Sequence, residues 1–160
     1  MRFPRFTIPV LAIVGVAALA LATRAPAVSA EPFKGRPEIV AATFSSAWCS
    51  ACKILKPRLK SVIPQFNGEP VQFVDLDFTF GARPEVKTVA QEAGVGPVYE
   101  RNKGATGFTV LVDRDTGEVI DILTINYSKK AMKAAISRAL AIASHTDDPA
   151  AAAPLTAEKG

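Results

Sequence analysis

The sequence predicts an α/β domain in which a mixed β-sheet is flanked by helices. Runs rich in β-branched and aromatic residues alternate with segments whose apolar residues recur at helical spacing. Two strand-like runs near the end of the domain are separated only by a short turn, which is typical of a hairpin. The resulting order is β, α, β, α, β, β, α. Parallel strands joined by helices, followed by a hairpin and a last helix, form a mixed sheet.

The first half of the domain supplies two strands and a helix. Residues 39–44 are almost continuously apolar, as expected of a strand that is covered on both faces. The next segment contains Pro57 and has an apolar residue at every third or fourth position, which predicts an amphipathic helix. Residues 71–76 form the second predicted strand. The apolar stripe of the helix consists of Leu55, Leu59, Val62 and Phe66.

A second helix should begin at Pro84, since proline suits the first helical turn, and end near Ala93 with Gly94 as its stop. The stretch from Val95 to Gly107 contains three glycines and a proline, and is predicted to be irregular.

Residues 108–113 form the third predicted strand, and a turn at 114–117 leads into a return strand over 118–124. Ser128 is a suitable N-cap for the final helix. Its predicted apolar face consists of Met132, Ile136, Leu140 and Ala143.

Residues 1–30 have the order of a secretory signal peptide. A short basic start precedes the apolar run Ile8 to Ala22, and a small-x-small pattern ends at Ala30, which is the predicted cleavage site. The alternative is an uncleaved membrane anchor. The run has 15 residues, fewer than the roughly 20 that a comfortable span requires, so cleavage is favoured.

The rest of the chain divides into a domain at 31–145 and a tail at 146–160. The tail is rich in alanine and polar residues and is predicted to be disordered. The whole chain carries a net charge of +4, but three arginines lie in the leader, which has no acidic residue. The mature protein is therefore nearly neutral and has no footprint for nucleic acid or an anionic membrane.

The two cysteines of the chain, Cys49 and Cys52, lie where the first helix should begin. The positive end of a helix stabilises a thiolate, and a thiolate beside a second thiol can perform thiol–disulfide exchange. Export would also place the pair where disulfides persist. Metal and cofactor sites are not predicted, because zinc requires about four ligands and His145 is the only histidine. Covalent haem attachment would need a histidine where Lys53 stands.

The sequence Trp48-Cys-Ser-Ala-Cys-Lys53 after a strand, with Pro57 five residues beyond the second cysteine, resembles the thioredoxin family. The order of elements and the hairpin turn also match, so the resemblance covers about Pro37 to Ser144. It implies a thioredoxin-like fold and an exported thiol–disulfide oxidoreductase. Cys49 would be the exposed nucleophile, and Cys52 the buried resolving thiol.

Two positions depart from the family pattern. The buried aspartate found six residues before the first cysteine is replaced by Thr43, which cannot titrate. The family's cis-proline before a threonine corresponds here to Phe108, before Thr109. A cis bond at a non-proline residue costs about 2.5–4 kcal/mol, so a trans bond is expected. Pro97 is a poorer counterpart, because the residues that follow it make an unsuitable buried strand.

Three aromatic residues each have two interpretations. Trp48 could shield the disulfide and form part of a docking surface, or pack partly into the core. Phe78 and Phe80 could contact the substrate or belong to the core.

Several charged residues also have two interpretations. Asp75 and Asp77 could assist proton transfer in place of the missing aspartate, although a loop position is the simpler expectation. Lys53 could favour the thiolate but is expected to face solvent, as is the basic cluster from Lys53 to Lys60.

The resulting hypothesis is a periplasmic or secreted reductant of protein disulfides that acts through Cys49 and Cys52 and needs no cofactor. Its partners would be protein thiol or disulfide clients, with a membrane electron donor as a further candidate. The alternatives are a disulfide oxidase or isomerase and a non-catalytic binding module of the same fold. The dipeptide Ser50-Ala51 does not decide between reductant and oxidant.

Overall fold

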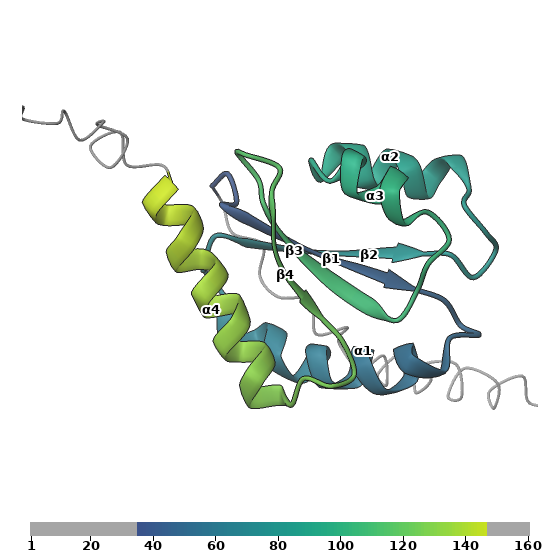
Figure 1. Cartoon of the computed structure of the whole chain (residues 1–160), viewed down its shortest axis with the longest axis horizontal. Coiled ribbons are helices and arrows are strands. Elements are labelled where there is room, and N and C mark those ends of the chain that lie inside the picture. The colour runs from purple at the N-terminus through teal and green to yellow at the C-terminus, as the bar shows by residue number, and fades with distance from the viewer. Residues whose placement is uncertain (1–34, 147–160) are drawn as a thin grey trace, which may run out of the picture.

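The computed structural model describes residues 35–146 and shows a four-stranded mixed sheet (Figure 1). The strand order is β2-β1-β3-β4. The strands are β1 (Ile39–Ser45), β2 (Val71–Asp77), β3 (Phe108–Asp113) and β4 (Val119–Leu123). Strand β1 pairs in parallel with β2 and antiparallel with β3, and β3 pairs antiparallel with β4. The predicted fold class is therefore confirmed, whereas the predicted leader at 1–30 and nearly all of the predicted tail lie outside the described residues.

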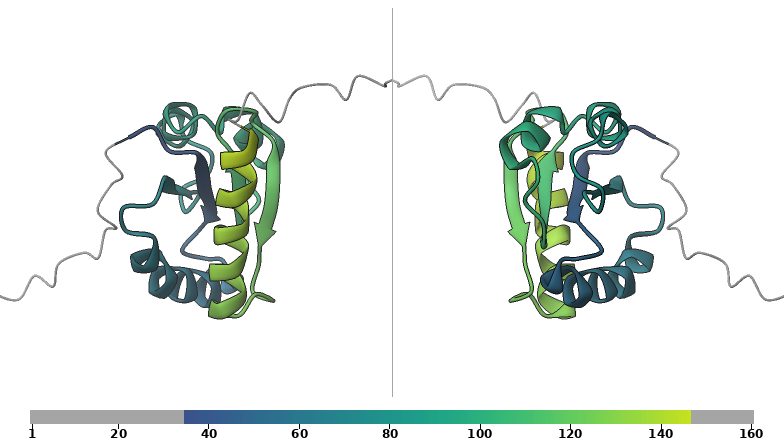
Figure 2. Two further views of the ribbon diagram at one scale, coloured as in Figure 1. Left: turned by 90° about the vertical axis from the view of Figure 1, so that its left-hand side faces the viewer. Right: turned by 90° about the vertical axis from the view of Figure 1, so that its right-hand side faces the viewer.

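Helices cover both faces of the sheet. They are α1 (Ser50–Val62), the short 3-10 helix η1 (Ile63–Phe66), α2 (Pro84–Glu92), α3 (Gly96–Asn102) and α4 (Lys129–Thr146). Helices α1 and α4 pack on one face, and α2 and α3 pack on the other (Figures 1 and 2). None of the helices within residues 35–146 has the length and apolar character needed to cross a membrane.

Strand β1 lies at the centre of the core, and all seven of its residues are buried. Because side chains alternate along a strand, Ile39 and Ala41 contact the α1/α4 layer, while Val40, Ala42 and Phe44 contact the α2/α3 layer. This explains why the run is apolar without alternation. The strand that leads to the cysteines is thus packed on both faces and bonded along both edges.

The expectation of an irregular stretch between Val95 and Gly107 was wrong, because residues 96–102 form helix α3. Pro97 occupies the first turn of this helix, and Val98 and Tyr99 are buried. The ring of Tyr99 stacks on Phe78 with the centroids 5.9 Å apart. A helix of seven residues is too short to show a clear apolar period, and its flanking glycines obscured it further.

The end of the domain forms as predicted. The turn between β3 and β4 is closed by Asp113, whose Oδ1 accepts hydrogen bonds from the backbone N–H groups of Asp115 and Thr116, both at 2.9 Å. Ser128 Oγ accepts from the backbone N–H of Ala131 at 3.2 Å and caps α4.

Arg58 on α1 links this helix to the loop before α4. Its Nη1 donates to the carbonyl oxygen of Ile125 at 2.6 Å and to that of Tyr127 at 3.2 Å. The basic stretch from Lys53 to Lys60 is therefore not only a solvated face, and that expectation was wrong for Arg58.

Candidate active site

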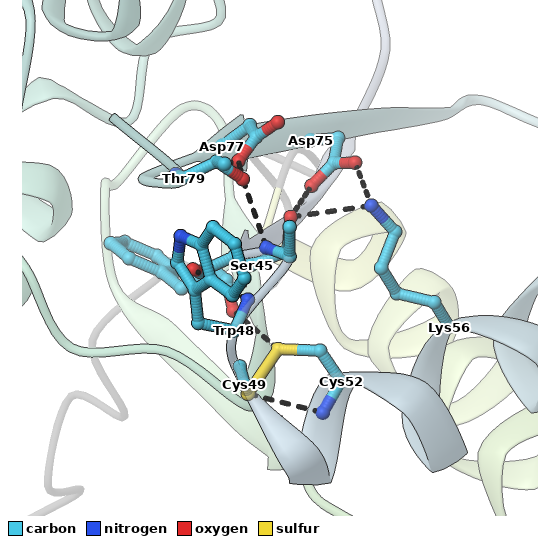
Figure 3. Close-up of a disulfide and its surroundings, with 11 residues drawn as sticks. Ser45, Trp48, Cys49, Cys52, Lys56, Asp75, Asp77 and Thr79 are labelled. Carbon is cyan, nitrogen blue, oxygen red and sulfur yellow. Dashed lines mark hydrogen bonds and ion pairs between the residues drawn. A yellow bond between two sulfur atoms is a disulfide. The ribbon is translucent and has the colours of Figure 1, made fainter. Parts of the chain in front are cut away.

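The two cysteines lie where the chain leaves β1 and enters α1 (Figure 3). They form a disulfide with their Cα atoms 5.2 Å apart. Cys49 is the N-cap of α1, with φ −79° and ψ 113°, and Cys52 lies in the first turn. The site is thus built on the end of a buried strand and the start of a helix, as the sequence indicated.

The Cys49 sulfur lies at the positive end of α1. Its Sγ accepts a hydrogen bond from the backbone N–H of Cys52 at 3.1 Å, and the first turn contains no acidic residue. In the reduced protein, the same N–H group and the helix dipole would stabilise a thiolate at Cys49. Cys49 is also partly exposed, so a partner can reach it.

Cys52 is held in a different environment. It is only 3% exposed, and its Sγ lies 3.9 Å from the carbonyl oxygen of Phe44. Cys49 is therefore the more accessible of the two sulfur atoms, and Cys52 is largely shielded from solvent.

Below the pair, Thr43 occupies the position at which the family carries a buried aspartate. Its Oγ1 lies 2.9 Å from Oγ1 of Thr109, to which it is also paired across β1 and β3. Both side chains are buried. The two hydroxyls satisfy each other, and neither can take up the proton of a thiol at neutral pH.

Phe108 begins β3 with an ordinary trans bond, as expected, since no cis peptide bond occurs within residues 35–146. Its ring stacks on Phe44 with the centroids 4.9 Å apart. The residue before it, Gly107, has φ +101°, and a Cβ atom there would lie 3.0 Å from Cβ of Ala51 and 3.4 Å from Sγ of Cys49. Sequence reasoning missed Gly107, although a glycine directly before a strand is a signal of close backbone approach.

Asp75 and Asp77 lie on β2 and not in a loop, so the simpler expectation for them was wrong. Asp75 accepts a hydrogen bond from Ser45 Oγ at 2.6 Å and forms an ion pair with Lys56, whose Nζ lies 2.5 Å from its Oδ2 (Figure 3). Lys56 Nζ also lies 3.3 Å from Ser45 Oγ. Ser45 and Lys56 were not predicted as site residues, because the pairing of β1 with β2 brings Ser45 to Asp75 and the packing of α1 on the sheet brings Lys56 there.

Asp77 lies at the end of the same strand, on the rim of the site. Its Oδ1 accepts hydrogen bonds from the hydroxyl of Thr79 at 2.5 Å and from the Thr79 backbone N–H at 2.8 Å. These two hydrogen bonds hold the pKa of Asp77 below its ordinary value, and the bond from the Thr79 hydroxyl has the larger effect. Thr79 Oγ1 in turn accepts from the backbone N–H of Ala47, which ties the loop before Cys49 to β2.

Two aromatic side chains near the site are open to solvent. Trp48 is 81% exposed, so the interpretation as partial core packing was wrong for this residue. Phe80 is 76% exposed and lies 5.5 Å, by its ring centroid, from the guanidinium of Arg83. Phe78, by contrast, is buried and stacks on Phe44. Trp48 therefore remains a candidate for partner contact.

Histidine, cysteine, aspartate and glutamate side chains do not gather in groups of three or more anywhere within the described part of the chain. His145 is exposed near the end of α4, as expected of a solvated residue.

No protein-family model and no curated protein sequence matches the chain. Among solved structures, StoA from Bacillus subtilis is similar at 14% identity over 64% of this chain and 85% of StoA, with a TM-score of 0.45. A mutant thioredoxin from Halobacterium salinarum is similar at 21% identity over 65% and 76% of the two chains, with a TM-score of 0.41. Thioredoxin F from spinach chloroplast shares 20% identity over 68% and 73%, with a TM-score of 0.38.

Similarities of this size support no conclusion, and the chain's own topology carries the fold assignment. The strand order β2-β1-β3-β4, the helices on both faces and the Cys-x-x-Cys disulfide at the start of α1 together make a thioredoxin-like fold.

Proposed function

We propose that this protein is an exported thiol–disulfide oxidoreductase that exchanges disulfides with other proteins through Cys49 and Cys52. The observation that carries the proposal is the asymmetry of the pair. Cys49 is partly exposed, caps α1 and accepts a hydrogen bond from Cys52 N–H, whereas Cys52 is buried behind it. A purely structural disulfide would add little stability here, because closing a loop of two intervening residues restricts the unfolded chain only slightly.

Exchange in the reducing direction takes two steps. The Cys49 thiolate attacks one sulfur of a client disulfide, the other client sulfur leaves as a thiolate, and a mixed disulfide forms. Cys52 then loses its proton and attacks Sγ of Cys49, and the second client sulfur leaves as a thiolate. The client has gained two electrons and the protein holds the Cys49–Cys52 disulfide, which an upstream dithiol donor must reduce again.

The reductant role and the periplasmic or secreted location are the finer parts of the proposal. The predicted leader with cleavage after Ala30 supports the location. Direction depends on the reduction potential of the pair, since about 30 mV corresponds to about 1.4 kcal/mol for a two-electron couple. Equilibration of the pair with glutathione measures it. A value near about −270 mV supports a reductant and a value near about −120 mV supports an oxidant.

The activity itself is tested by insulin reduction with dithiothreitol as the electron source. The wild type should accelerate insulin reduction, and Cys49→Ser should reduce the rate to the uncatalysed background because the attacking sulfur is lost. Ser61→Ala, an equally small change at an exposed position of the same helix outside the motif, is the control and should retain activity. If the wild type is no faster than Cys49→Ser and its disulfide resists dithiothreitol, the protein is a non-catalytic binding module.

A further inference from the structure

An open hollow of about 340 Å³ lies beside the disulfide, on the side of the buried sulfur. Cys52 lines it together with Ser45 and Lys56. The hollow matters for the second step of the exchange, in which Cys52 must become a thiolate. A role for its lining residues in that step rests on the proposed function.

Burial works against the Cys52 thiolate. A thiol that is almost fully buried is harder to ionise than one in water, because the charged form loses its hydration. The two polar side chains at this end of β1 carry no charge: the Thr43 hydroxyl is hydrogen-bonded to Thr109, and Ser45 donates to Asp75. A compensating positive charge must therefore come from elsewhere.

Lys56 lies four residues after Cys52 on α1, so the two side chains project from the same face of the helix, one turn apart. The position of its ammonium group is fixed by two contacts with neighbouring strands, Asp75 on β2 and Ser45 on β1 (Figure 3). Ser45 in turn donates its hydroxyl proton to the other oxygen of Asp75. The three side chains form a closed triangle of hydrogen bonds at the edge of the hollow.

Three other charged groups lie close to the same hollow. Asp77 lines it, but its carboxylate accepts hydrogen bonds from Thr79 at the rim. Lys53 also lines it and is exposed, and as the immediate neighbour of Cys52 it projects from a different face of α1. Asp75 lies behind Lys56 and does not line the hollow. Lys56 is thus the charge that shares both the helix face and the hollow with Cys52.

We infer that Lys56 is a positioning residue that stabilises the thiolate of Cys52 during the second step, and that the negative charge of Asp75 moderates this effect. The Cys52 proton passes to water in the hollow, the thiolate forms its bond with Sγ of Cys49, and the bond from Cys49 to the client breaks. Lys56 exchanges no proton or electron and acts only through its charge.

The test uses the reduced protein and an aromatic disulfide, dithiobis(nitrobenzoate), whose released thiolate is coloured. Attack by Cys49 releases the first equivalent, and attack by Cys52 on the mixed disulfide releases the second. Stopped-flow measurement of the second phase against pH therefore reports the ionisation of Cys52. In parallel, NMR titration of cysteine labelled at Cβ, in the Cys49→Ser background, measures Cys52 without coupling to the other thiol.

Lys56→Met should raise the pKa of Cys52 and slow the second phase about threefold to tenfold at neutral pH, with the rate recovering at high pH where Cys52 is fully ionised. Asp75→Asn should lower the pKa of Cys52 and speed the second phase, because it removes the negative charge that moderates Lys56.

Lys60→Met, one further turn along the same helix, is the matched control and should behave as the wild type.

The inference is overturned if Lys56→Met titrates like Lys60→Met, or if Asp75→Asn shifts the second phase in the same direction as Lys56→Met, which would indicate a merely structural contact. These outcomes are separate from the proposed function. If the protein fails to reduce insulin but the two variants shift the second phase in opposite directions, the inference about Lys56 stands and the proposed function is contradicted. If the protein reduces insulin but the opposite shifts are absent, the function stands and the inference is contradicted.

Discussion

Strand β1 and the four residues that follow it are adjacent in sequence and opposite in environment. Every residue from Ile39 to Ser45 is buried, whereas Trp48, three residues further on, is 81% exposed. The strand is packed on both faces, and the segment after it carries the partly exposed sulfur of Cys49, the proposed nucleophile. Stability and reactivity are therefore separated over a few residues, so that mutations on either side should affect different measurements.

The largest expected effect comes from the buried side. Phe44 has no exposed surface and stacks between Phe78 and Phe108. Phe44→Ala should lower the free energy of unfolding by about 3–5 kcal/mol, because it removes buried apolar surface and leaves a cavity. Urea denaturation followed by circular dichroism measures this.

Trp48→Ala is the matched control on the exposed side, and it should change the free energy of unfolding by no more than about 0.5 kcal/mol. An equal loss from both variants would contradict the separation, since it would mean that the exposed segment also carries the fold.

An intermediate effect is expected where the two regions meet the start of β3. Gly107→Ala places a side chain at φ +101°, 3.0 Å from Cβ of Ala51 and 3.4 Å from Sγ of Cys49. It should destabilise the protein by about 1–2 kcal/mol for the backbone alone, and in addition slow the attack of Cys49 on the aromatic disulfide.

Gly117→Ala separates the two contributions. Gly117 also has a positive φ, +72°, but a Cβ atom there would meet nothing within 4 Å. It should destabilise through its backbone alone and leave the first phase of thiolate release unchanged. If Gly107→Ala reacts as fast as Gly117→Ala, close approach of Gly107 to the disulfide has no role in reactivity.

The smallest effect is expected at the rim, where the exposed segment is tied to β2. The hydrogen bonds from Thr79 lower the pKa of Asp77. The charged carboxylate therefore stabilises the folded state at pH values above the ordinary aspartate pKa of about 4. This contribution is lost as the pH falls through the lowered pKa. Because Asp77 is largely exposed, Asp77→Asn should reduce stability by less than about 0.5 kcal/mol at pH 7, and the difference should shrink as the pH falls through the lowered pKa.

Thr79→Val removes the hydroxyl that lowers the pKa of Asp77 most, and it should reproduce part of the same pH dependence. Urea denaturation from pH 2 to 7 measures both variants. A stability difference that persists unchanged at pH 2 would show that the carboxylate charge is not its source.

Sequence reasoning succeeded where a periodic pattern extends over a whole element. The continuous apolar run of β1 and the stripe from Leu55 to Phe66 record burial directly, since each of these apolar positions is buried. It failed for α3, because seven residues span only two turns and Gly96 and Pro97 suggested a loop.

For the site, the cysteine pair could be predicted because its parts are close in sequence. The neighbours of the pair could not, since Asp75 reaches Lys56 only through the pairing of β1 with β2 and the packing of α1 on the sheet, and Gly107 reaches Cys49 only at the start of β3. Contacts of this kind depend on how the strands and helices pair and pack, which cannot be predicted from a local sequence pattern.

The tether made by Arg58 bears on how the domain responds when the disulfide is reduced. Because Arg58 on α1 donates to the carbonyl groups of Ile125 and Tyr127 in the loop before α4, we expect reduction to leave the second half of the helix in place and to affect mainly its first turn and the segment before it. Under the proposed function, a client would then tell the oxidised from the reduced protein by the residues around Trp48.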